Sequence, residues 1–137
     1  MERWNGETVE RWNSVEKLKS YKELDVWKIS MDFVVDIYKL TKSFPTLELY
    51  GLTNQIRRSA VSVPSNIAEG SGRKNTREFI QFLYVSNGSL SELETQLELA
   101  HRIGYISNIE NIIEKIKHII KMLINLIRAL ENKLTSK

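Results

Sequence analysis

Apolar residues recur at alternating spacings of four and three through the second half of the chain, and this repeat constrains the fold most strongly. The two rows are Phe79, Leu83, Ser86, Leu90, Leu93, Leu97 and Ala100, followed by Ile109, Ile113, Ile116, Ile120, Leu123, Ile127, Leu130 and Leu134. Such spacing packs one face of an α-helix against neighbours that cross at about +20°, as in helical bundles. We therefore predict two long, closely packed helices in this half.

Two further helices are predicted over residues 24–42 and 50–70. Their apolar rows are Trp27, Met31, Val34 and Tyr38 in the first helix, and Leu52, Ile56, Ser59, Val63 and Ile67 in the second. Pro45 separates them because proline lacks a backbone donor and disfavours helix in the residue before it. Four helices joined by short connections predict an all-α fold, an antiparallel up-down-up-down four-helix bundle.

Capping residues indicate where the helices begin and end. Asn75 with Glu78, and Ser107 with Glu110, have the spacing of a capping box at a helix N-terminus. Glycines at helix C-termini often adopt the left-handed conformation that ends the helix. The candidates for this role are Gly70, Gly72 and Gly104.

The composition limits the class of protein. The 137 residues suffice for one domain, predicted over 21–137, which follows an N-terminal extension, 1–20, that we expect to be flexible. The chain has no cysteine, which excludes disulfides and thiolate chemistry. It shows neither a signal-peptide core nor a long apolar run, so we expect a soluble cytoplasmic protein without a membrane partner. A formal charge of +3 permits a nucleic-acid partner without requiring one.

The extension contains a short internal repeat, because the sequence ERWN at 2–5 recurs at 10–13. Tryptophans of this kind can stack on bases or fill a pocket of a protein partner. The alternative is an extension without a role. Its four basic and four acidic residues balance, so charge does not favour it as a nucleic-acid-binding arm.

Two of the predicted helices are more apolar than a lone bundle requires. The last helix carries a second row, Ile112, Ile119 and Leu126, and the first helix is apolar over most of its surface, including Phe33 and Ile37. A surface helix normally shows one apolar stripe. We therefore predict that these five residues form a homo-oligomer interface, and the alternative is a wide core within a monomer.

A proline and a glycine occur inside predicted helices. Pro64 leaves the carbonyl of Ala60 without its usual partner, and Gly88 costs about 1 kcal/mol relative to alanine. Small residues are frequent around both positions. We predict that the second and third helices cross closely there, with serines or water bonding the freed carbonyl. Leucine at position 88 should then disrupt folding.

Catalytic patterns are incomplete. Di-iron bundles use a Glu-x-x-His motif on each of two helices. Glu98 and His101 have this spacing, but Glu114 and His118 are four residues apart. The apolar rows of the two helices predicted over 24–42 and 50–70 contain no carboxylate. Phosphate-binding glycine loops and nucleophile motifs are also missing from the sequence. We predict a non-enzyme without catalytic residues, metal or cofactor.

Five blocks of the sequence resemble a bacterial family, the four-helix bundle proteins or 23S rRNA intervening-sequence proteins. The blocks are YKELDVWK at 21–28, IYKLTKSFP at 37–45, GLTNQIRRSAVSVPSNIAEGSGR at 51–73, REFIQFLY at 77–84 and GSLSELETQLELAHRIGY at 88–105. The resemblance implies a homo-oligomer, described as a closed pentamer. The fold is also similar to the accessory variability determinant of diversity-generating retroelements, which implies a reverse transcriptase and nucleic acid as partners.

Five cations are the predicted nucleic-acid-binding residues. Arg73, Lys74 and Arg77 fall at the turn between the second and third helices, and Arg57 and Arg58 lie one helix-length earlier. In a ring these cations would repeat around one rim, so that modest phosphate contacts act together. We predict a basic oligomeric scaffold that binds the RNA or DNA backbone with little sequence preference. The alternative is a protein-interaction scaffold without nucleic-acid binding.

Overall fold

The computed structural model describes residues 20–136, which form helices and connecting segments without a strand. Its elements are η2 (Tyr21–Glu23), α2 (Asp25–Thr41), η3 (Thr46–Glu48), α3 (Leu52–Ser71), α4 (Thr76–Ile103) and α5 (Glu110–Thr135), of which η2 and η3 are short 3-10 helices. The all-α prediction with four helices is confirmed for this range. The predicted extension, apart from Ser20, and its ERWN repeat lie outside the described residues.

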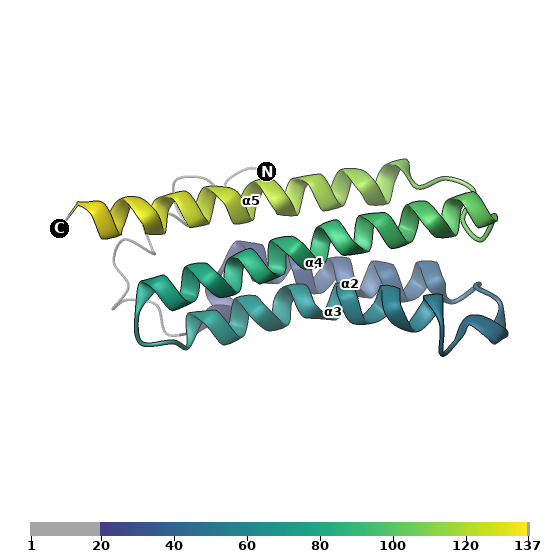
Figure 1. Ribbon diagram of the computed structural model, residues 1–137, viewed down its shortest axis with the longest axis horizontal. Coiled ribbons are helices and arrows are strands. Elements are labelled where there is room, and N and C mark those ends of the chain that lie inside the picture. The colour runs from purple at the N-terminus through teal and green to yellow at the C-terminus, as the bar shows by residue number, and fades with distance from the viewer. Residues whose placement is uncertain (1–19, 137) are drawn as a thin grey trace.

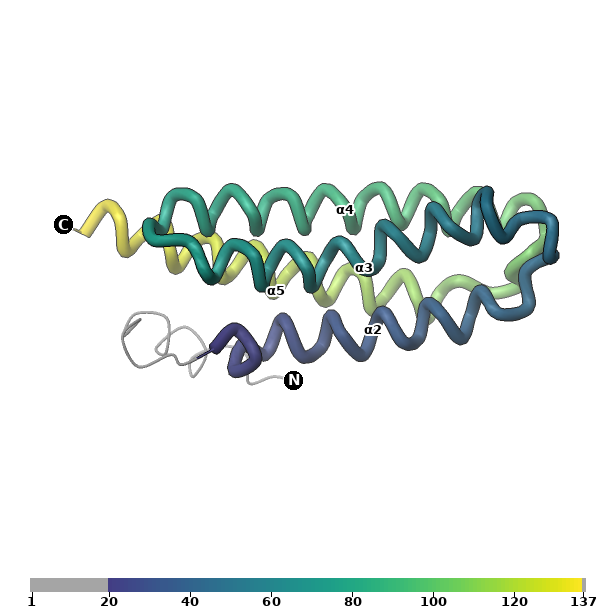
Figure 2. The backbone as a smooth tube through the Cα atoms, turned by 90° about the horizontal axis from the view of Figure 1, so that it is seen from below, coloured from purple at the N-terminus to yellow at the C-terminus, as the bar shows by residue number. Residues whose placement is uncertain are grey.

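The four α-helices lie side by side along the long axis of the molecule (Figure 1). The turn between α3 and α4 lies at one end, and the α2–α3 and α4–α5 connections lie at the other (Figure 1). Figures 1 and 2 both show α3 beside α4, and this pair packs most extensively. By contrast, α2 and α5 share few contacts. The α2–α5 side is therefore the loosest part of the bundle.

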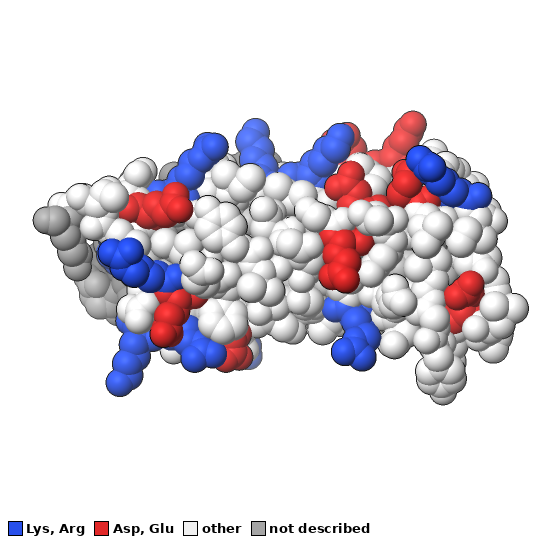
Figure 3. Space-filling model, viewed as in Figure 1, with Lys and Arg blue, Asp and Glu red and all other residues white. Residues whose placement is uncertain are grey.

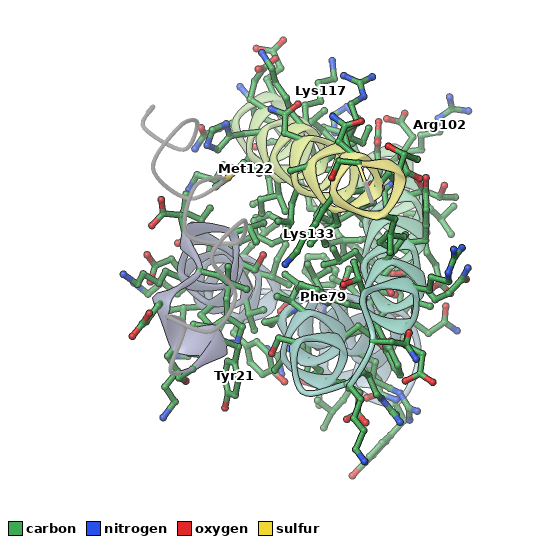
Figure 4. All side chains as sticks on the ribbon, turned by 90° about the vertical axis from the view of Figure 1, so that its left-hand side faces the viewer. Tyr21, Phe79, Arg102, Lys117, Met122 and Lys133 are labelled. Carbon is green, nitrogen blue, oxygen red and sulfur yellow. The ribbon has the colours of Figure 1, made fainter. Side chains whose placement is uncertain are left out.

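The apolar rows predicted for α3 and α4 point into the core. All seven row positions of α4 are buried, and in α3 only Leu52 is half-buried. Phe79, the first of the α4 row, points toward the interior between the helices (Figure 4). The four-and-three spacing therefore identified the buried faces of these two helices correctly.

The row predicted for α2 is wrong. Met31 and Tyr38, which belong to that row, are 42% and 43% exposed. The buried apolar residues of α2 are instead Val26, Phe33 and Ile37. Because apolar residues surround most of this helix, their spacing alone does not identify one buried face.

The predicted oligomer interface also requires correction. Ile112, Ile119, Leu126, Phe33 and Ile37 are all buried inside the single chain, with at most 8% of any of them exposed. The physical reason is that α5 packs against both α4 and α2, so two adjacent rows of α5 are needed to fill one core. The wide-core alternative describes the single chain, and these side chains are not presented to a second copy.

The predicted start and end of α4 are confirmed. The side chain of Asn75 accepts a hydrogen bond from the backbone N–H of Glu78 at 2.8 Å. Gly104 follows the helix with a φ of 100°, which is the left-handed conformation that glycine adopts without strain.

Two other predicted caps are wrong. Gly104 is the one described residue with positive φ, so neither Gly70 nor Gly72 forms a left-handed cap. Before α5, the side chain of Asn108 accepts from the backbone N–H of Glu110 at 2.9 Å, in the role that was predicted for Ser107.

The close approach between α3 and α4 occurs at Gly70. A Cβ atom added to Gly70 would lie 2.6 Å from the Cβ of Phe82 and 2.9 Å from Cδ1 of Phe79. Gly88 is exposed, and a Cβ added there meets nothing within 4 Å. The prediction that Gly88 lies in the close crossing, and that leucine there disrupts folding, is therefore wrong.

Serines line the same contact between the two helices. The hydroxyl oxygens of Ser62 and Ser89 are 2.8 Å apart, and the Ser86 hydroxyl donates to the Val63 carbonyl at 2.8 Å. The Ser86 bond thus reaches Val63 rather than the Ala60 carbonyl that was predicted to need it. The helix α3 continues through Pro64, which is buried. Small polar side chains therefore let the helices approach while bonding across the contact.

Gly70→Ala should lower the free energy of unfolding by about 1–3 kcal/mol, because the added methyl group overpacks the contact with Phe79 and Phe82. Gly88→Ala is the matched control. It adds a methyl group in open space to an exposed helix, and it should raise the free energy by about 0.5–1 kcal/mol. Urea unfolding of the two variants measures both changes, at protein concentrations where the unfolding midpoint does not depend on protein concentration. Equal effects of the two substitutions would contradict the close approach at Gly70.

Candidate nucleic-acid interface

Three exposed cations surround the turn between α3 and α4. Arg73 and Lys74 belong to the turn itself, and Arg77 lies in the first turn of α4. The guanidinium group of Arg73 contacts the Glu69 carboxylate at 2.8 Å and lies over the ring of Phe82, 4.8 Å from its centroid. These two contacts hold Arg73 in place at the surface.

Lys74 and Arg77 have no ion-pair or hydrogen-bond partner among residues 20–136, so both charges face solvent. The N-terminus of α4 adds a partial positive charge beside them, because its first backbone N–H groups point toward this end. Figure 3 shows Lys and Arg side chains around this end with carboxylates among them, and a further group of carboxylates nearer the middle of the molecule. The turn is therefore a cationic surface of modest strength.

The structure does not join Arg57 and Arg58 to this surface. Fourteen residues or more of α3 and its turn separate them from Arg73, which corresponds to roughly 20 Å at the helical rise of 1.5 Å per residue. Adjacent helical residues also point about 100° apart. The predicted group of five cations is therefore one group of three at the turn and two separate arginines.

Arg57 stabilises the contact between α2 and α3. Its Nε donates to the Thr41 hydroxyl at 2.9 Å, and its guanidinium group lies over the Tyr38 ring at 4.5 Å from the centroid. A second guanidinium nitrogen reaches the Tyr38 carbonyl at 3.5 Å. Arg58 is exposed on the outer side of α3 and has no partner in the described part of the chain. Of the two arginines, only Arg58 is free to contact a phosphate.

Sequence reasoning missed a groove beside the cationic turn. It lies between the start of α4 and the end of α5, and its volume is about 620 Å³. Arg77, Ile80, Gln81, Glu131, Asn132, Leu134 and Thr135 line it. Because the two halves of this lining come from segments about fifty residues apart, no local sequence pattern predicts the groove. It gives the turn a concave flank with amide donors and acceptors next to Arg77.

A different set of contacts holds the opposite end together. The Glu48 carboxylate accepts from the Leu52 backbone N–H at 3.1 Å and from the Tyr105 hydroxyl at 2.8 Å. The bond from Leu52, and then that from Tyr105, lowers the pKa of Glu48. The bond to Glu48 in turn raises the pKa of Tyr105. Glu48 thus connects the start of α3 to the segment between α4 and α5.

Glu98 and His101, the half of a di-iron motif, take part in local contacts. Glu98 accepts from Arg102 at 2.9 Å, and the Nδ1 of His101 lies 2.8 Å from the Ile106 carbonyl oxygen. Within the described range, no three His, Cys, Asp or Glu side chains are grouped so that they could hold a metal ion.

Residues 20–136 thus form an all-helical fold with three exposed cations at the turn between α3 and α4. No helix within residues 20–136 combines the length and apolar character needed to cross a membrane. The family model of the 23S rRNA-intervening sequence protein matches residues 22–125, and the chain belongs to this family. The resemblance of the sequence blocks to the 23S rRNA intervening-sequence proteins is thereby confirmed. No curated protein matches the chain.

The contact of Glu48 with Leu52 and Tyr105 predicts how stability depends on pH. The lowered pKa of Glu48 means that its contribution is present above its ordinary pKa of 4.5 and is lost as the pH falls through the lower folded value. The raised pKa of Tyr105 means that its contribution is present below 10.0 and is lost as the pH rises through the higher folded value.

Glu48→Gln should therefore lower the free energy of unfolding between pH 4.5 and pH 10.0. It should also weaken the loss of stability that the unaltered chain shows below and above this range. Thermal unfolding from pH 3 to pH 11 measures this effect. Tyr50→Phe is the control, because Tyr50 lies near the same end but is 91% exposed. A parallel pH profile for Glu48→Gln and the unaltered chain would show that the contact contributes nothing.

Proposed function

We propose that this protein is a non-enzymatic, oligomeric scaffold that binds the backbone of RNA or DNA through the turn between α3 and α4. The observation that carries the proposal is the group of Arg73, Lys74 and Arg77 at one end, with the last two facing solvent. The name of the family, which refers to an intervening sequence of 23S rRNA, gives further support. We place the scaffold in a bacterial cytoplasm, as an accessory to an rRNA intervening sequence or to a reverse transcriptase.

Binding at this end would rest on phosphate contacts. Arg73 is already oriented by Glu69 and Phe82, so less side-chain entropy is lost when it meets a phosphate. Lys74, Arg77 and the N-terminus of α4 add positive charge from the same side. Such contacts position a nucleic acid without reading its bases, and we therefore propose little sequence preference.

The antiparallel up-down-up-down bundle is, in this proposal, the subunit of a closed homo-oligomer, a pentamer by resemblance. Since the interface predicted from the sequence is buried in each chain, the contact needs another surface. The outer face of α4 exposes Tyr84, Val85, Leu99 and Ile103, each about half exposed. Gly88 lies among them, and its empty Cβ position would let the backbone of a second copy approach closely.

The proposed assembly explains the presence of Gly88 in a long helix. Glycine costs about 1 kcal/mol relative to alanine in a helix interior, and none of residues 20–136 contacts this position closely. A neighbouring copy packed over it would offset that cost. Each copy would contribute one cationic turn, and several weak phosphate contacts would then act together.

Reversal of Arg73, Lys74 and Arg77 to glutamate should abolish the shift of structured RNA in a gel at low salt. For a binding site that uses all three cations, a plot of the logarithm of the unaltered protein's affinity against the logarithm of the salt concentration should have a slope of about −2 to −3. The slope is measured by fluorescence anisotropy from 50 to 300 mM salt.

The matched control reverses Arg102, Lys117 and Lys121, three exposed cations away from the turn. Arg102 is a close counterpart of Arg73, because it also bonds to a glutamate one helical turn earlier, at 2.9 Å. The control variant should retain binding. Equal losses in the two triple variants would show that net charge, rather than the turn, determines affinity.

Gly88→Leu tests the oligomer. The fold should tolerate leucine at this exposed position, so the helical circular dichroism signal should stay unchanged. If the outer face of α4 is the interface, the larger side chain should shift the mass measured by light scattering from a closed assembly toward single chains. Asn111→Leu, at an exposed position of α5, should leave the mass unchanged. A single chain for the unaltered protein at micromolar concentration would contradict the oligomer.

A protein-interaction scaffold is the second candidate function. The observation that favours it is the apolar surface around η3, where Leu47 is 82% and Tyr50 is 91% exposed. Both residues lie in the connection between α2 and α3, which is at the end opposite the cationic turn (Figure 1). A protein that binds no RNA or DNA at low salt would favour this candidate.

A further inference from the structure

The groove beside the cationic turn is formed by facing sides of two helices. Lining residues that are three or four positions apart share one face of each helix. On α4 they are Arg77, Ile80 and Gln81, and on α5 they fall between Glu131 and Thr135. The end of α5 projects past the turn between α3 and α4 (Figures 1 and 2), so α5 supplies a wall that continues beyond the turn.

The more buried residues of this lining are apolar, and the exposed ones are polar. Ile80 is 6% exposed and Leu134 is half-buried. The side chains of Gln81, Glu131 and Asn132 are exposed and bond to no other side chain among residues 20–136. A ligand that suits the groove therefore has an apolar face and carries hydrogen-bond donors and acceptors along its edge.

We infer that the groove binds the base of an unpaired guanine nucleotide whose phosphate contacts Arg77. This inference rests on the proposed function and names the part of the nucleic acid that the site selects. The volume of about 620 Å³ lies within the range of roughly 300–1,000 Å³ that is typical of pockets for small organic ligands, so a base with its ribose fits. Arg77 belongs both to the groove and to the cationic turn, and it thus joins base binding to phosphate binding.

Glu131 favours guanine over the other bases. Guanine has two neighbouring donors, N1–H and the N2 amino group, and a carboxylate accepts from both at once. In adenine and cytosine the amino donor stands beside a ring nitrogen that is an acceptor and repels the second carboxylate oxygen. Uracil has one donor between two carbonyl groups. The amide groups of Gln81 and Asn132 can in addition donate to O6 and N7 of guanine.

Only an unpaired base can reach Glu131 in this way. In a duplex the N1–H and N2 amino donors of guanine already bond to cytosine, and the base is held in the stack. A loop or a bulge presents an unstacked base without the cost of opening a base pair. The phosphate contacts of the turn stay indifferent to sequence, so the selectivity concerns a single position of the bound strand.

Four RNA hairpins with equal numbers of phosphates test the inference. They share one stem and a loop of uridines in which one position is guanosine, inosine, adenosine or uridine. Fluorescence anisotropy with the full chain at one low salt concentration measures their affinities. The guanosine hairpin should bind about tenfold more tightly than the uridine hairpin. Inosine lacks the N2 amino group and should lose most of this gain, and adenosine should show none of it.

The hairpins also separate this inference from the proposed function. Equal affinities for all four hairpins would overturn the inference and leave phosphate binding at the turn intact. An inosine or adenosine hairpin that binds as tightly as the guanosine hairpin would overturn it as well. If none of the hairpins binds, the inference and the proposed function both fail.

Glu131→Gln tests the role of the carboxylate. This variant should reduce the ratio of guanosine-hairpin to uridine-hairpin affinity from about ten to about one. Glu92→Gln is the matched control, because it removes the same charge from an exposed position of α4 outside the groove, and it should leave the ratio unchanged. The ratio cancels the general effect of charge on phosphate binding. An unchanged ratio in Glu131→Gln would overturn the inference.

Thr135→Trp tests the position of the base by filling the groove from an exposed position of its wall. The affinity for the guanosine hairpin should fall to that for the uridine hairpin, while the helical circular dichroism signal stays unchanged. Ser136→Trp is the control, because Ser136 is the next exposed residue and does not line the groove. Retention of the guanosine preference in Thr135→Trp, or its equal loss in both variants, would overturn the inference.

Discussion

The contact between α3 and α4 at Gly70 sets the geometry of the end that carries the α3–α4 turn. The missing side chain of Gly70 allows the backbone of α3 to lie against Phe79 and Phe82 of α4. Phe82 is also the ring on which Arg73 rests. One aromatic residue therefore connects the packing of the core to the orientation of a surface cation. A shift of the helices at this point would move the cationic turn with it.

The opposite, looser side of the bundle explains other features of the chain. Because α5 packs against α4 and faces α2 with few contacts, it needs two apolar rows to close the core. That requirement accounts for Ile112, Ile119 and Leu126 without a second copy. It also leaves a groove with an acidic rim, which a tightly packed α2–α5 pair would not contain. The wide apolar surface of α5 thus belongs to the fold, and the proposed assembly would instead use the exposed apolar residues of α4.

The two ends of the molecule differ in chemistry. At the end with the α3–α4 turn, Lys74 and Arg77 present positive charge to solvent beside a groove that contains amide side chains. At the other end, Glu48 and Tyr105 join the helix connections, and exposed apolar residues surround η3. The proposed nucleic-acid contact and the alternative protein contact would thus use opposite ends of the molecule. The proposed ring would place all copies of each end on the same rim.

The sequence by itself determined the helices, the buried faces of α3 and α4, and the caps at Asn75 and Gly104, because these depend on neighbours within a turn of helix. Only the tertiary structure decided which face of α2 and α5 is buried. A helix that is apolar over most of its surface can turn either face inward, and the neighbouring helices select one. The position of α2 likewise decides the roles of Arg57 and Arg58. Adjacent side chains on a helix point about 100° apart, and α2 lies on the side of α3 where Arg57 can bond to Thr41.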